Sequence, residues 1–234
     1  MSPGSRTGNG AAPDPADDGR DRAEERMLRF IRRHVRDRRV LDAMRAVPRD
    51  EFVPPGLRRH AFDDGALPIG SGQTISQPLI VAMMSQAAAL HGDERVLEVG
   101  TGSGYQAAVL ARLAREVVTV ERVGPLLRRA RATLRRLGVR NVRCLPATGD
   151  LGAPDDGPFD AIVVTAAAPE VPSALVEQLA AGGRLVIPVG RRTHQELLVV
   201  TKRGKRLRRR SLGGCRFVPL LGAGGFADES GQPS

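Results

Sequence analysis

The sequence predicts an α/β fold, in which a doubly wound, mostly parallel sheet carries an antiparallel C-terminal strand and an N-terminal helical cap. Three observations predict it. Apolar runs of strand length alternate along the chain with segments of helical periodicity, a pattern typical of parallel sheets covered by helices. The run Arg95–Val99 places apolar side chains on both of its faces, as a strand inside such a sheet does. A glycine-rich loop follows this run and leads directly into the helix-forming segment Gln106–Ala114.

Length and composition bound the domain organisation. With 234 residues, of which 41% are hydrophobic, the chain can bury one sizeable core and carry an extension. We expect a disordered tail over residues 1–20, a main domain over 21–222 that includes the cap, and a loose tail over 223–234. No run approaches the ~20 apolar residues of a membrane span. The N-terminus also lacks the apolar core of a secretory signal.

Charge and cysteine content favour a cytoplasmic protein without a nucleic-acid partner. The formal net charge is +10, but the basic residues are nearly all arginine and are spread along the chain, and only 3% of residues are aromatic. Aromatic platforms for stacking single strands are therefore scarce, and a solvated arginine-rich surface is the simpler interpretation. Cys144 and Cys215 fall in predicted strands, which indicates buried free thiols and a reducing location. We predict no metal site.

The cap is predicted from two short helices near the N-terminus. A helical pattern begins near Asp21, with Met27, Ile31 and Val35 on one face and arginines on the other. A second helix is expected over Arg38–Ala46, before a proline stops it. This segment is too short to form a core of its own, so we expect it to cover the main sheet.

Ser76 has two interpretations. It precedes Pro78 and the apolar helix Leu79–Leu90, so it can be the N-cap of that helix, with the proline in the first turn. Alternatively, its hydroxyl faces a cofactor or substrate. A serine hydrolase is disfavoured, because no serine lies in a G-x-S-x-G elbow.

The glycine loop predicts a nucleotide-like or anionic ligand. Its pattern is E-x-G-x-G-x-G from Glu98 to Gly104, and the helix that follows supplies unpaired N–H groups. A dinucleotide fingerprint would need its third glycine at position 105, which is Tyr105. The next predicted strand, Val117–Val120, ends in Glu121, whose carboxylate can accept hydrogen bonds from both ribose hydroxyls of an adenosine.

The remaining elements continue the alternation. We expect helices over Pro125–Leu137 and Pro172–Ala181, parallel strands over Asn141–Leu145, Phe159–Thr165 and Arg184–Val189, and a closing antiparallel pair of Gln195–Thr201 with Arg216–Leu220. The basic run 202–210 would then lie at the tip that links the closing pair.

Several motifs together resemble one enzyme family. They are Val47–Val53, Leu67–Gly70, Gly72–Pro78, Val96–Gln106, Val164–Pro172 and Arg216–Leu220, in that order. The glycine loop resembles the first motif of the Rossmann-like class I S-adenosylmethionine-dependent methyltransferases. The Thr-Ile-Ser-Gln-Pro and Thr-Ala-Ala-Ala-Pro segments narrow the resemblance to the protein-L-isoaspartate O-methyltransferases, over about Arg26 to Gly222.

The resemblance implies a repair enzyme that uses S-adenosyl-L-methionine to methylate the free α-carboxylate of L-isoaspartyl residues in damaged proteins. It implies Ser76 as the active-site serine, which orients the carboxylate and makes no nucleophilic attack. The cofactor-binding residues that it implies are Thr74, Ile75, Ser76, Glu98, Gly100, Thr101, Gly102, Ser103, Gly104, Glu121, Arg122, Thr148 and Gly149.

The chain departs from this family in one loop. Relatives carry Gly-Asp-Gly there, and their aspartate contacts the adenine amino group. Aligned from Pro158, that aspartate falls on Thr148, and Asp150 comes two residues late. Either Asp150 reaches the adenine, or the backbone and Thr148 hold it.

Two other functions remain open. The charge would suit a methyltransferase of RNA or of another small substrate. The Thr148 departure would suit a non-catalytic protein that binds the cofactor. For the repair enzyme we expect isoaspartyl proteins and peptides as partners, a monomer, and neither membrane nor nucleic-acid binding.

Overall fold

The computed structural model describes residues 15–204 and 206–227. Within them, seven strands form one sheet in the order β5-β4-β3-β6-β7-β8-β9. The strands are β3 (Arg95–Val99), β4 (Glu116–Glu121), β5 (Val142–Pro146), β6 (Phe159–Val164), β7 (Leu179–Arg191), β8 (His194–Arg203) and β9 (Arg206–Cys215). The ladders from β5 through β7 are parallel, and β7–β8 and β8–β9 are antiparallel. The predicted doubly wound, mostly parallel sheet is confirmed.

Helices cover the two faces of this sheet unequally. They are α1 (Pro15–Ile31), α2 (Arg38–Ala46), α3 (Pro78–Ala88), α4 (Tyr105–Ala111), α5 (Gly124–Arg136) and α6 (Ser173–Glu177), with 3-10 turns η1 (Arg49–Phe52), η2 (Pro55–His60) and η3 (Pro154–Asp156). Side chains of α1 to α5 share one core with Val96 and Val117, whereas α6 belongs to the core on the opposite face with Leu97 and Val99. Strand β3 therefore is buried on both faces, as its sequence predicted.

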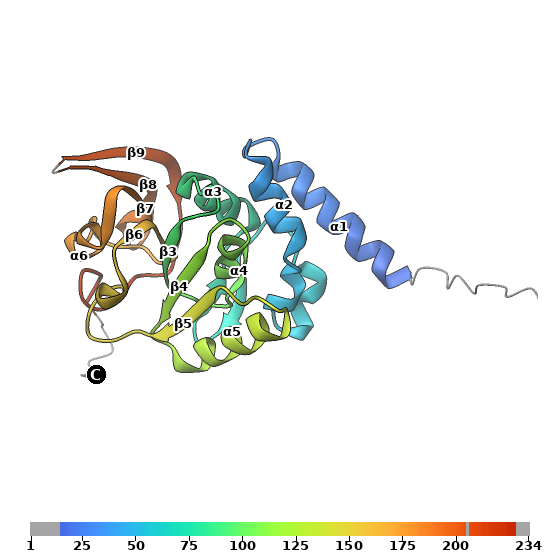
Figure 1. The fold of residues 1–234 in the computed structure, drawn as a ribbon. Helices are drawn as coiled ribbons and strands as arrows, with labels where there is room; N and C mark the ends of the chain where they lie inside the picture. Colours follow the sequence, from blue (N-terminus) through green and yellow to red (C-terminus); the bar gives the residue numbers. More distant parts are fainter. Residues whose placement is uncertain (1–14, 205, 228–234) are drawn as a thin grey trace, which may run out of the picture.

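The N-terminal cap shares the main core. Met27, Ile31 and Val35 are buried in the same cluster as α3 and α4, which confirms that this segment covers the sheet. Helix α1 begins at Pro15, earlier than the start predicted near Asp21, so part of the expected tail is helical. Figure 1 shows α1 and α2 at the end of the molecule away from the β8–β9 hairpin. Residues 1–14, the rest of the expected tail, lie outside the described residues.

A small two-stranded sheet connects the cap to the main sheet. It pairs β1 (Leu67–Gly70) with β2 (Gln73–Ile75) in antiparallel register. Ile69 of β1 and Ile75 of β2 are its buried side chains. Because α3 follows within a few residues, this hairpin carries the Thr74–Ser76 segment across the carboxyl ends of the central strands.

The last third of the chain differs from the prediction. The basic run contributes the end of β8 and the first half of β9, an edge strand that pairs with β8, whereas the segment Arg216–Leu220, which was expected to pair with Gln195–Thr201, lies outside the sheet ladder. Pro219 instead forms an isolated bridge with Ala167, and the Leu220 amide donates to the Ala167 carbonyl over 2.7 Å. An edge strand with charged side chains has no apolar alternation, so periodicity alone does not reveal it.

The predicted helix Pro172–Ala181 is also shorter than expected. Helix α6 ends at Glu177, and β7 begins at Leu179 and continues through the two glycines that were expected to end the helix. The β6–β7 ladder contains an irregularity at this end, between Phe159 and Ala161. The glycines therefore allow an irregular start of the strand. Within residues 15–204 and 206–227, no helix combines the length and hydrophobicity that a membrane crossing requires.

Candidate functional site

A cleft of about 890 Å³ lies at the carboxyl ends of β3, β4 and β6. The chain leaves β3 toward β4 on one side, whereas β6 lies on the other, so the cleft occupies the switch point at which open α/β sheets bind ligands. The lining residues come from the β2–α3 segment, the glycine loop, the end of β4, the loop 147–152, and the segment 218–223.

Gly100 brings the glycine loop close to the end of β6. Its φ is +100°, and a Cβ added there would lie 2.3 Å from Oγ1 of Thr165. The Thr165 hydroxyl donates to the carbonyls of Val99 at 3.1 Å and Gly100 at 2.6 Å. Only glycine permits both this conformation and this approach, so the loop and the β6 end form one wall of the cleft.

Glu121 is fixed by backbone amides at the end of β4. Gly102 N–H donates to its Oε2 and Val123 N–H donates to its Oε1, each over 2.8 Å. The side chain is buried, yet it lines the cleft. A carboxylate held this way still has free lone pairs, which suit the two hydroxyls of a ribose.

Glu98 has a different environment. It is 0% exposed, and its Oε2 accepts a hydrogen bond of 2.5 Å from the Thr119 hydroxyl, which in turn lies 2.7 Å from that of Thr101. Its Oε1 has no hydrogen-bond partner although Glu98 lines the cleft. Burial raises the pKa of Glu98 to about 8, with a further contribution from the charge of Glu121. An unpartnered buried acceptor is costly unless a ligand supplies a donor, and a cationic donor would favour the ionised form.

Ser76 is not the N-cap of α3. The cap position is Gln77, and no side chain caps the helix. Ser76 is half-buried and lines the cleft, next to Thr74 and Ile75, so the structure favours the second interpretation of this serine. Its backbone carbonyl accepts a hydrogen bond of 2.7 Å from Nη2 of Arg49.

All the predicted cofactor-binding residues line this cleft except Gly104. Gly104 is the N-cap of α4, with φ of +89°, and a Cβ there would lie 3.2 Å from the Cβ of Ala130 on α5. It permits close packing of two helices and lies behind the ligand side of the loop. Both Thr148 and Asp150 are exposed and line the cleft, so the geometry leaves both available to an adenine.

Sequence reasoning missed the far wall of the cleft. The residues of this wall are Val218, Pro219, Leu220, Leu221, Gly222 and Ala223. They follow β9 and return to the carboxyl end of the sheet beside Ala167. The apolar composition of Arg216–Leu220 predicted a strand of the main sheet and gave no sign that this segment borders a cleft. Among the described residues no group of three or more metal-ligating side chains occurs.

The fold and this cleft define a Rossmann-like class I methyltransferase. A solved protein-L-isoaspartate O-methyltransferase superposes with a TM-score of 0.77 at 29% identity, covering 86% of this chain and 67% of that one. A Plasmodium falciparum chain assigned to the same enzymes, solved in complex with S-adenosyl-L-homocysteine, gives a TM-score of 0.73 at 27% identity, with 83% and 96% covered.

Sequence comparison identifies the family. The pattern of the protein-L-isoaspartate(D-aspartate) O-methyltransferases (PCMT) matches residues 22–224. Protein-L-isoaspartate O-methyltransferase 1 of Syntrophobacter fumaroxidans is 53% identical over 207 residues, which cover 88% of this chain and 96% of that protein. The chain belongs to the protein-L-isoaspartate O-methyltransferase family, as its motifs predicted.

Proposed function

We propose that the chain transfers the methyl group of S-adenosyl-L-methionine to the free α-carboxylate of L-isoaspartyl residues in damaged proteins and peptides. One observation carries the proposal: a single cleft joins the glycine loop to the Gln73–Ser76 segment and to the apolar wall 218–223. A cofactor on the loop and a peptide against these segments would share one space. Family membership supports the same reaction, with S-adenosyl-L-methionine as methyl donor and protein repair as the role.

The residues of the cleft fit this cofactor. The volume of about 890 Å³ is within the range of small-molecule sites. The unpartnered Oε1 of Glu98 would accept a hydrogen bond from the ammonium of the methionine part, and Glu121 would accept the ribose hydroxyls. Thr101, Gly102 and Ser103 line the cleft as well, and they would contact the cofactor between its methionine part and its ribose. Thr148 and Gly149 would border the adenine, with Asp150 as the alternative contact.

The proposed reaction requires the protein to position the carboxylate against the methyl group of the cofactor, and it requires no proton transfer by a side chain. When bound, the sulfonium of the cofactor supplies an activated methyl group. A peptide α-carboxylate, with a pKa near ~4, is ionised at neutral pH, so the protein need not supply a base. In the proposal, the Ser76 hydroxyl donates a hydrogen bond that orients this carboxylate, while the cleft walls exclude water.

The proposal extends to partners and location. Isoaspartyl proteins and peptides are the substrates, and the enzyme acts as a monomer in the cytoplasm. Leu207 is the one large hydrophobic residue that is exposed within the described part of the chain, which supports a monomer because stable interfaces need larger apolar patches. Cys144 and Cys215 are both free, which supports a reducing compartment.

The decisive experiment offers labelled S-adenosyl-L-methionine to two peptides that differ only in carrying isoaspartate or aspartate at one position. We expect label on the isoaspartyl peptide alone, released as methanol by mild base because the product is an ester. Label on neither peptide, with cofactor binding intact, would overturn the proposal and favour a non-catalytic binding protein. Transfer to RNA in place of both peptides would favour the nucleic-acid alternative.

A further inference from the structure

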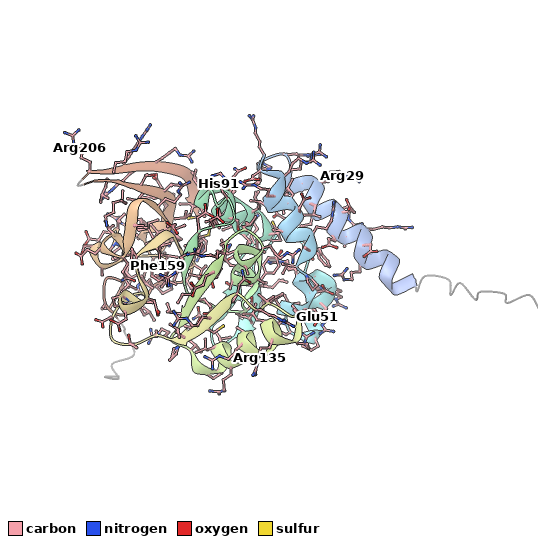
Figure 2. The ribbon with its side chains drawn as sticks, in the orientation of Figure 1. Arg29, Glu51, His91, Arg135, Phe159 and Arg206 are labelled. Atoms are coloured by element: carbon pink, nitrogen blue, oxygen red, sulfur yellow. The ribbon has the colours of Figure 1, made fainter. Side chains whose placement is uncertain are left out.

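The motif Val47–Val53 takes no direct part in the cleft, yet it connects the cap to the main domain. Its turn η1 contributes Asp50, whose two oxygens each accept a 3.0 Å hydrogen bond from Arg20 on α1. Glu51 pairs with Arg136 at the end of α5 over 2.7 Å, and Figure 2 shows Glu51 beside that helix end. The turn is thus tied to two helices that lie far apart in sequence.

Arg49 carries this connection to the cleft. It is 0% exposed. Its Nε donates to the Ala61 carbonyl and its Nη2 donates to the Ser76 carbonyl, each over 2.7 Å. The guanidinium carbon lies 4.8 Å from the ring centroid of Tyr105, which lines the cleft, and Phe52 packs edge-on against the same ring.

The burial of this charge is costly and is not repaid by an ion pair. Both hydrogen bonds of Arg49 go to backbone carbonyls, its Nη1 has no hydrogen-bond partner, and no ion pair among the described residues includes it. Burial lowers its pKa. Buried charges in proteins are normally paired, and departures from such local rules concentrate at functional sites. Beyond filling space, this side chain supplies two hydrogen bonds to carbonyls and a cation over the Tyr105 ring, so packing alone does not explain an arginine here.

We propose that Arg49 is a positioning residue for methyl transfer: its guanidinium fixes the backbone at Ser76 and thereby aims the Ser76 hydroxyl into the cleft. The planar fork reaches two carbonyls in different segments while it lies over an aromatic ring. Lysine has no such fork and cannot reproduce that geometry. The inference rests on the proposed function, because it assigns Ser76 a part in the same reaction.

The first test replaces Arg49 by lysine, which keeps the charge and loses the fork. We expect the cofactor Kd to change by less than about twofold and kcat for an isoaspartyl peptide to fall by about tenfold or more, because small misplacements near reacting atoms are costly. Arg45→Lys is the matched control: Arg45 is exposed on α2 and pairs with Glu25, away from the cleft. Its kinetics should equal those of the wild type.

A double-mutant cycle separates positioning from general stability. If Arg49 acts through Ser76, then Arg49→Lys should lower kcat in the wild type but have little further effect in a Ser76→Ala background. Losses of kcat that multiply independently would overturn the inference. An unchanged kcat with only a lowered Tm would overturn it as well.

A second variant covers the case in which Arg49→Lys does not fold. Asp50→Asn weakens the bonds that join the η1 turn to Arg20, so the backbone that carries Arg49 is held less firmly and its guanidinium fixes the Ser76 carbonyl less well. We expect kcat to fall by about threefold at unchanged cofactor Kd, and we expect little further fall in kcat when Asp50→Asn is added to Ser76→Ala. An unchanged kcat in Asp50→Asn would contradict the inference. Wild-type activity is measured alongside, so an inactive wild type refutes the proposed function, whereas an active wild type with unaffected variants refutes only the role of Arg49.

Discussion

At the scale of single residues, two carboxylates in one cleft differ through their surroundings. Glu121 accepts hydrogen bonds from two backbone N–H groups, which fix the position of its carboxylate. Glu98 has one hydroxyl donor and is fully buried, so its pKa rises to about 8. The same residue type therefore supplies a fixed acceptor at one position and a proton-sensitive one at the other.

Glu98→Gln is expected to change how stability depends on pH. The folded protein holds a proton on Glu98 that the unfolded chain releases, because the pKa rises from 4.5 to about 8 on folding. The contribution of this bound proton to the free energy of unfolding is complete below pH ~4.5. It is lost as pH rises from ~4.5 through ~8, by up to ~1.4 kcal/mol per pH unit. Calorimetry of the cofactor-free protein at pH 5 to 8 should show a flatter profile for the variant.

The same substitution tests ligand binding. Affinity for the cationic cofactor should rise with pH toward ~8 in the wild type, as Glu98 ionises, and should lose this rise in Glu98→Gln. Glu177→Gln, on the exposed end of α6, is the control and should resemble the wild type in both experiments. Parallel pH profiles of wild type and Glu98→Gln would contradict the assignment.

At the scale of elements, the segment 221–227 packs at the cleft wall, although residues 223–227 were expected to belong to a loose tail. The Phe226 amide donates to the Leu220 carbonyl over 2.7 Å, and its carbonyl accepts from Gly222 N–H over 3.2 Å. The guanidinium of Arg192 lies 5.0 Å from the Phe226 ring centroid. These contacts hold Ala223 at the cleft wall; residues 228–234 lie outside the described residues.

Phe226→Ala is expected to loosen this wall. The contact between the Phe226 ring and Arg192 stabilises the folded position of the segment by about 0.5–1 kcal/mol. Because the variant lacks this contact, KM for an isoaspartyl peptide should rise by about threefold with kcat nearly unchanged. Steady-state kinetics measure both. Phe30→Ala, on α1 at the other end of the molecule, removes a ring of equal size and should leave KM unchanged; equal effects of the two variants would refute the role of the segment.

At the scale of the whole molecule, two apolar cores enclose one sheet, and the cleft opens where the chain reverses its direction of strand addition. The cap belongs to the larger core, and its turn η1 is tied to Ser76 through Arg49. Binding in the cleft involves the glycine loop, the Gln73–Ser76 segment and the 218–223 wall together, and Arg49 joins the Ser76 carbonyl to the cap, so a bound cofactor should stabilise the entire domain.

Saturating S-adenosyl-L-methionine should therefore raise the Tm of the whole domain in a single transition. At 100 times Kd, mass action contributes about 2.7 kcal/mol. For a domain of this size, that corresponds to a rise of about 5–10 °C, measurable by scanning calorimetry. Gly102→Val, which places a branched side chain on the cleft at a φ of +53°, should show no rise. A wild type whose Tm does not respond would exclude cofactor binding in this cleft.

The parts of the fold that could be predicted are those with local signals. Helix α2 has the bounds predicted from its periodicity, and the glycine loop follows β3 as expected, because side-chain period and glycine spacing are visible within a few residues. Strand β9 and the path of Arg216–Leu220 could not be predicted, since an edge strand and a wall segment owe their positions to distant partners.

The same division applies to the site. By itself, the sequence determined the α/β class, the adenosine-type loop, Glu121 at a strand end and the family, because each depends on residue type and spacing. Only the tertiary structure decided that Ser76 faces the cleft while Gln77 caps α3, that Gly104 packs between helices, and that Arg49 is buried against the Ser76 carbonyl. These outcomes depend on which surfaces meet when segments far apart in the chain pack together, and one-dimensional patterns do not contain that information.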